Sequence, residues 1–126
     1  MSEPREPRRA IAPDEWEKFL REFSERNKNR RARFDIFFAS GETVEEAEEG
    51  RLESISLNKN GGNAEIVVVR ADNTEGEKET MTDTLENARG VVVQYETDGS
   101  ENALEITDAK NTLFSLRLES KLDGNS

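Results

Sequence analysis

The stretch that decides the fold is residues 11–23, with the sequence IAPDEWEKFLREF. Its large apolar side chains recur at the spacing of one face of an α-helix, and they are Trp16, Phe19, Leu20 and Phe23. Pro13 suits a first helical turn, and Asp14 and Glu15 favour the positive end of the helix dipole. The spacing therefore predicts an amphipathic helix whose apolar face packs on the rest of the protein.

After this helix the apolar pattern changes to period two, which is the spacing of β-strands. The runs that predict strands lie at about residues 34–38, 51–57, 66–69, 80–82, 91–95, 103–107 and 114–118. The adjacent Gly61 and Gly62 predict a tight hairpin turn, because glycine adopts positive φ angles without strain. The run at residues 80–82 is short and polar, which predicts an edge strand.

These elements predict an α+β protein in which the N-terminal amphipathic helix packs on a strongly curled antiparallel sheet or a partly open barrel of six to seven strands. A chain of 126 residues has the usual length of a single domain, which we place at residues 11–119. We expect a disordered arm at residues 1–10, where two prolines stand among charges, and a flexible tail at residues 120–126.

Three stretches together resemble an uncharacterised bacterial family known only as a domain of unknown function. They are the helical pattern of residues 11–23, GRLESIS at residues 50–56 and ALEI at residues 103–106. The resemblance covers about residues 11–119 and implies a small bacterial α+β protein, with no activity or site residues attached. The order of elements is also similar to that of Sm-like RNA-binding barrels, but the strand signatures of that family are not evident, so no RNA-binding residue is inferred.

The composition removes many functional classes, because the chain contains neither histidine nor cysteine. It therefore has no imidazole base, no thiol nucleophile and no histidine or cysteine ligands for zinc or haem. Neither a Gly-rich phosphate loop nor a Gly-x-Ser-x-Gly nucleophile motif occurs. We expect a protein that is not an enzyme and that has no cofactor and no metal site.

The charge balance bears on the partners and the compartment. Asp and Glu number 28 against 18 Lys and Arg, so the formal net charge is −10 and the average surface repels nucleic acid and anionic lipid. No apolar run reaches the roughly 18 residues of a membrane helix, and residues 1–10 lack the apolar segment of a signal peptide. We expect a cytoplasmic protein that does not bind membranes.

A basic segment is the candidate interaction site, and its members are Arg26, Lys28, Arg30, Arg31 and Arg33. These cations could form a patch for phosphates or an acidic partner, or they could simply favour a helix C-terminus and an exposed strand. An acidic segment follows, with Glu42, Glu45, Glu46, Glu48, Glu49 and Glu53. It is either a solvated loop or the complement of the basic segment in a head-to-tail assembly.

The sequence thus predicts a non-catalytic protein-interaction or self-assembly module, whose partner is another protein or a second copy. One alternative is a nucleic-acid accessory protein that uses residues 26–33, although the net charge disfavours nucleic acid. Another is a small-ligand carrier or enzyme with a pocket in the curled sheet, which needs a buried carboxylate. Asp35 is the best candidate for such a carboxylate, and its alternating strand predicts that it points to solvent.

Overall fold

A computed structural model describes residues 8–46, 50–74 and 77–119 of the chain. In chain order the elements are β1 (Arg8–Ala10), the 3₁₀ helix η1 (Pro13–Glu15), α1 (Trp16–Arg26), β2 (Arg31–Phe37), β3 (Thr43–Glu45), β4 (Gly50–Asn60), β5 (Asn63–Thr74), β6 (Glu77–Leu85), β7 (Ala88–Tyr95), β8 (Glu101–Asp108) and β9 (Leu113–Leu118). The predicted helix and all seven predicted strands are present, so the α+β class is confirmed.

The predicted strand count of six to seven is wrong, since nine strands occur among the described residues. The two additional strands are β1 and β3, each of three exposed residues, so neither has the apolar alternation that marks a strand in sequence. Backbone pairing with β7 holds β1, and pairing with β2 holds β3. The predicted disordered arm is therefore wrong for residues 8–10, while residues 1–7 and the tail at 120–126 lie outside the described residues.

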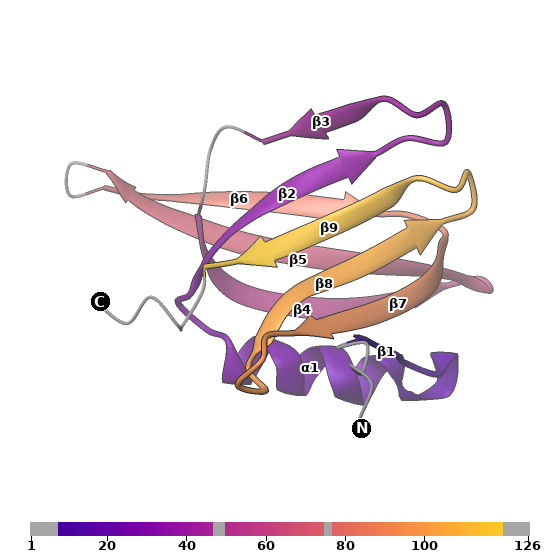
Figure 1. The fold of residues 1–126 in the computed structure, drawn as a ribbon, viewed down its shortest axis with the longest axis horizontal. Coiled ribbons are helices and arrows are strands. Elements are labelled where there is room, and N and C mark those ends of the chain that lie inside the picture. Colours follow the sequence, from indigo (N-terminus) through magenta and orange to yellow (C-terminus); the bar gives the residue numbers. More distant parts are fainter. Residues whose placement is uncertain (1–7, 47–49, 75–76, 120–126) are drawn as a thin grey trace, which may run out of the picture.

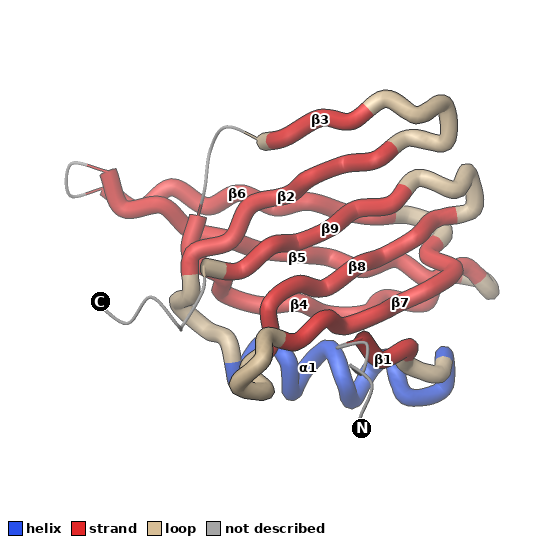
Figure 2. The backbone as a smooth tube through the Cα atoms, viewed as in Figure 1, coloured by secondary structure: helices blue, strands red, loops and turns tan. Residues whose placement is uncertain are grey.

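The nine strands form one antiparallel sheet in the order β1-β7-β8-β9-β2-β4-β5-β6, with β3 also paired to β2. The sheet divides at β2, which pairs with β4 only through Arg31 and Ala32 and with β3 through its last three residues. Strands β4–β6 consequently turn away and lie behind β2, β9, β8 and β7 as a second layer (Figure 1). The sheet does not close into a barrel (Figure 2).

The core fills the space between the two layers and the helix. All four members of the predicted helical stripe are buried, and Leu20 and Phe23 are completely so. Trp16 also donates a hydrogen bond from its indole N–H to the carbonyl of Ile11, at 2.9 Å. Opposite the helix lie fully buried aliphatic side chains from both layers, namely Leu52, Ile55, Ile66, Val68, Leu104, Ile106 and Leu116.

The helix lies along one side of the sheet, between the two layers. It packs against β4, and the chain just before it is tied to β7 because the N–H of Ile11 donates to the carbonyl of Val91, at 2.9 Å. The predicted glycine turn joins β4 to β5, with φ angles of +60° at Gly61 and +93° at Gly62. Within the described residues, no helix is long and apolar enough to cross a membrane.

Candidate functional site

Strand β6 ends the strand order and forms a free edge of the sheet. It pairs with β5 in one continuous register, from Thr74 opposite Glu77 to Ile66 opposite Leu85. No described strand pairs with its other side. Because every second residue of an antiparallel strand directs its N–H and C=O away from its partner, β6 presents a row of unpaired backbone donors and acceptors. The edge strand predicted at residues 80–82 is confirmed, and it is longer than expected.

The side chains of β6 do little to block this edge. The strand contains no proline, its single lysine, Lys78, is the second residue of the strand, and the pairing with β5 has no bulge. Thr80, Thr82 and Thr84 are exposed, and their β-branched side chains suit an extended strand. The inward-pointing charge of Asp83 is a device that natural edge strands use against strand addition, but here an arginine neutralises it. The edge is therefore open to another strand.

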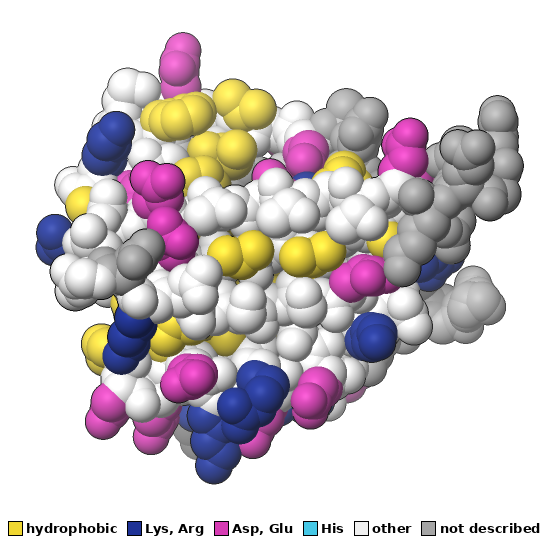
Figure 3. All heavy atoms as spheres, turned by 180° about the vertical axis from the view of Figure 1, so that it is seen from behind, with side chains coloured by type: hydrophobic (Ala, Val, Ile, Leu, Met, Phe, Trp, Pro, Cys, Tyr) yellow, Lys and Arg dark blue, Asp and Glu magenta, His cyan; other side chains and the backbone are white. Residues whose placement is uncertain are grey.

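The outer face of β4, β5 and β6 carries no charge at its centre. Opposite residues share a face, so Ser54, Val69 and Thr82 form one row across the three strands, and Ser56, Val67 and Thr84 form the next. These six residues are called the uncharged face below. Viewed from behind, neutral side chains occupy the middle of the molecule and charged ones lie mostly toward its margins (Figure 3). Such a face is notable in a chain with 37% charged residues.

A buried arginine on β5 links β6 to the segment that follows β3. The guanidinium of Arg70, on β5, donates to both carboxylate oxygens of Glu46, at 2.8 and 3.0 Å, and to Asp83 of β6, at 3.0 Å. It also donates to the carbonyl of Ala32 on β2, at 3.1 Å, and it lies 5.0 Å from the centre of the Phe34 ring. We call Arg70, Glu46 and Asp83 the arginine clamp, because they connect β5 and β6 to the segment just after β3, which no backbone ladder joins to them.

The charges of the clamp sustain one another. Burial opposes the charge of Arg70, but hydrogen bonds from its guanidinium to Glu46 and Asp83 outweigh this and raise the pKa of Arg70. Burial likewise acts to raise the pKa of Glu46, but the hydrogen bonds from Arg70 and from the N–H of Phe34 outweigh it and lower that pKa. Gly50 lies beside the arginine clamp, and a Cβ atom at this position would come within 2.6 Å of Met81 Cε. Because hydrogen bonds favour their charged forms, Arg70 and Glu46 are both ionised at neutral pH.

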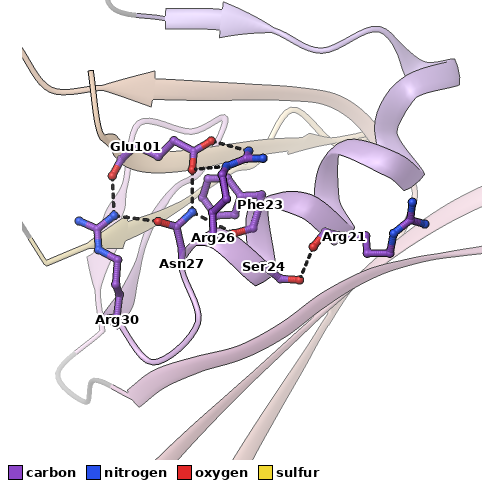
Figure 4. A network of polar contacts seen from close by, with 7 residues as sticks. All are labelled: Arg21, Phe23, Ser24, Arg26, Asn27, Arg30 and Glu101. Carbon is purple, nitrogen blue, oxygen red and sulfur yellow. Dashed lines mark hydrogen bonds and ion pairs between the residues drawn. The ribbon is translucent and has the colours of Figure 1, made fainter. Parts of the chain in front are cut away.

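Two members of the basic segment, Arg26 at the end of α1 and Arg30 in the loop after it, both hydrogen-bond to Glu101 of β8 (Figure 4). Arg26 donates from Nε and Nη2 to the two carboxylate oxygens of Glu101, at 3.1 and 2.7 Å, and the hydrogen bond raises the pKa of Arg26. Arg30 donates to Asn27 Oδ1 and to the carbonyls of Glu101 and Glu119, and its burial lowers its pKa. The charges of Arg26 and Arg30 are therefore used in contacts within the protein.

The other basic candidates lie elsewhere. Lys28 is exposed after the helix, whereas Arg31 and Arg33 lie on β2 and line a surface hollow with Arg117. Arg33 Nε is 3.7 Å and Arg117 Nε is 3.6 Å from the carboxylate of Asp35. Asp35 is only 7% exposed, so the prediction that it points freely to solvent is wrong. It does lie on the outer side of the sheet, but the two long arginine side chains flank it there.

The acidic segment is also dispersed. Glu42 and Glu45 are exposed, Glu53 is half-buried on β4, and Glu46 belongs to the clamp. Glu48 and Glu49 lie outside the described residues. Of the side chains that are described, no three acidic groups converge on a point where they could hold a metal ion. The sequence signal that could have marked the clamp was a single arginine, Arg70, directly after the apolar run at residues 66–69.

Comparisons with other proteins add nothing to these observations: no family model, no curated protein and no solved structure matches the chain. The resemblances drawn from its sequence therefore stay predictions. The free edge of β6, with the uncharged face beside it, is the feature of the described structure that calls for a functional explanation.

Proposed function

We propose that this protein binds another polypeptide by strand addition at β6. The observation that carries the proposal is the nine-residue edge strand that lacks a bulge and has exposed threonines at alternate positions. An added strand would hydrogen-bond to the unpaired backbone groups, each bond contributing about 0.5–1.5 kcal/mol. Such a module needs no catalytic group, which agrees with a composition that lacks histidine and cysteine.

The alternatives have less support from the geometry. Arg26 and Arg30 are engaged with Glu101 and neighbouring carbonyls, and the net charge of −10 opposes binding of nucleic acid. A carrier or enzyme needs a lined interior pocket, but the space between the layers is filled by fully buried aliphatic and aromatic side chains. A hollow of about 420 Å³ beside Tyr95 and Ser100 lies at the surface, where Arg26 and Glu101 pair with each other.

The test is a selection from phage-displayed random dodecapeptides on immobilised protein. The wild-type chain is expected to enrich peptides with β-branched residues at alternate positions. Thr82→Pro should reduce their recovery at least tenfold, because proline on an edge strand removes a backbone donor and blocks pairing. Recovery is measured by sequencing the bound phage and by titrating the best peptides.

The matched control is Thr97→Pro. Gly99 donates its N–H to the carbonyl of Glu96, so Thr97 holds the second position of a four-residue turn, where proline is favoured. If Thr82→Pro fails to fold, as judged by circular dichroism, Thr80→Lys combined with Thr84→Lys places two charges on the edge and keeps the backbone intact. Equal peptide recovery on wild type and on the folded edge variant, or no enrichment on monomeric wild type, contradicts the proposal.

A further inference from the structure

We infer that the strand added to β6 is β6 of a second copy of the chain, antiparallel and related by a twofold axis at Thr82. The inference rests on the proposed strand addition and names its partner. A twofold axis perpendicular to the sheet places each residue opposite one whose side chain lies on the same face. About Thr82, this sets Thr82 opposite its own copy and Thr80 opposite Thr84 of the second copy.

The inward-pointing residues of β6 favour this register. With the axis at Thr82, Asp83 lies opposite Met81 of the second copy, and Glu79 lies opposite Leu85. No like charges face each other between residues 79 and 85. Each acidic residue instead meets an apolar side chain, and the three threonines pair among themselves. Threonine pairs directly opposite each other stabilise antiparallel sheets.

The neighbouring twofold registers are worse. An axis at Met81 sets Glu79 opposite Asp83 of the second copy, twice in each dimer. An axis at Asp83 sets this residue opposite its own copy. Like charges directly opposite across antiparallel strands are destabilising, so of these three registers the sequence of β6 favours the axis at Thr82.

The uncharged face explains how two acidic chains could associate there. Each copy carries a net charge of −10, so two copies repel each other in general, and a contact surface without charges adds no local repulsion to this. Joining β6 to β6 would extend the rows of Ser54, Val69 and Thr82 without a break into the second copy. Because salt screens the general repulsion, added salt should strengthen this dimer. A head-to-tail contact between the basic and acidic segments would weaken instead.

The first experiment exchanges charges at the Thr80–Thr84 pair and measures molar mass by analytical ultracentrifugation over a range of concentrations. Thr80→Lys with Thr84→Lys, and Thr80→Glu with Thr84→Glu, should each weaken self-association at least tenfold. Thr80→Lys with Thr84→Glu should restore it, since each lysine then faces a glutamate. A mixture of the all-lysine and all-glutamate proteins should form heterodimers.

The matched control is Asn58→Lys with Asn63→Lys. These positions are exposed near the β4–β5 turn and lie outside the uncharged face, so the variant gains the same charge away from the edge. It should associate as the wild type does. The lysine substitutions also reduce the net negative charge, which by itself favours association, so a loss in the Thr80/Thr84 variant reports local repulsion.

A crosslinking experiment tests the register directly, because the chain has no cysteine of its own. Thr82→Cys should be joined to its copy by a short bismaleimide, whereas Thr97→Cys, in an exposed turn, should not. Thr80→Cys mixed with Thr84→Cys should give a crosslinked heterodimer. Crosslinking of Thr80→Cys to itself with equal yield would overturn the register.

The outcomes separate this inference from the function on which it rests. The wild-type chain could stay monomeric at every concentration and still recover peptides that Thr82→Pro does not. This result would overturn the second copy as the partner but would agree with strand addition at β6. A monomeric chain that recovers no such peptide overturns both. A dimer that the charged edge variants leave unchanged also overturns the inference, because association then occurs at another surface.

Discussion

The sheet is open on two sides, between β7 and β4 and at β6, and the two sides differ in what covers them. Between β7 and β4 the gap is covered by α1, whose buried aromatic and aliphatic side chains close the core. On the side of β6, Arg70 reaches across to Glu46, just past β3, and to the carbonyl of Ala32 on β2. Apolar side chains therefore cover the first side. On the second side a few charged hydrogen bonds span the gap, and the edge of β6 stays unpaired. A sheet that stops short of a barrel can thus keep one edge covered and another available.

The largest effect is expected on the covered side, from Phe23→Ala. Phe23 is fully buried, and its ring centre lies 5.8 Å from that of Phe19. Truncation removes a large apolar group and leaves a cavity, so we expect a loss of about 3–5 kcal/mol in the free energy of unfolding. Urea denaturation followed by tryptophan fluorescence measures it, since Trp16 lies on the same helix.

The matched control is Phe38→Ala, because Phe38 is 40% exposed and lies just after β2. It should cost less than about 1 kcal/mol, as expected for a largely exposed apolar group. Equal losses for the two phenylalanines would show that the helix does not close the core as described.

The second largest loss of stability is expected from Arg70→Met, which breaks the arginine clamp. Methionine keeps the packing against Phe34 but leaves Glu46 and Asp83 without their partner. Removing one member of a fully buried pair typically costs 3–5 kcal/mol. Because the carboxylate side chains are 29% and 39% exposed and can be hydrated, we expect about 2 kcal/mol here. Hydrogen exchange should accelerate in β6 and not in α1, and uniform acceleration would contradict a local clamp.

A smaller effect should appear in the dependence of stability on pH. The pKa of Glu46 is lower in the folded protein than in the unfolded chain, so the unfolded state binds protons first as the pH falls. The stabilisation from Glu46 is therefore complete above its ordinary pKa, about 4.3, and is lost as the pH falls through the lower folded value. Glu46→Gln should flatten the stability curve below about pH 5, as measured by urea denaturation at each pH.

A double-mutant cycle sharpens this prediction. In the Arg70→Met background the guanidinium that lowers the pKa of Glu46 is gone, so Glu46→Gln should change the slope of the curve much less. The same flattening in both backgrounds would place the origin of the shift elsewhere, for instance in the N–H of Phe34.

How far the sequence predicts this structure depends on the range of the interactions. The helix follows from a local stripe, and the β4–β5 turn follows from Gly61 and Gly62, so both were predictable. Strand β3 was not, because its three residues are exposed and only pairing with β2 defines it. The clamp was hidden for a similar reason, since Arg70 meets partners 24 and 13 residues away in the chain. The basic segment could be located but not interpreted, because Glu101 lies 75 residues from Arg26.

The smallest effect should come from the polar fastening of the covered side, through Arg26→Gln. The Arg26 side chain is 47% exposed, so its ion pair with Glu101 is screened by water and should contribute about 0.2–1 kcal/mol. That contribution should shrink in 1 M NaCl, whereas the loss from Phe23→Ala should persist. Arg21→Gln, an exposed arginine on the same helix, is the control for the altered charge. A loss above about 2 kcal/mol would mean that Asn27, which is 2% exposed and also donates to Glu101, depends on Arg26 for its position. The covered side would then be held by a polar network as well as by apolar area, and the contrast with the clamp would be one of degree.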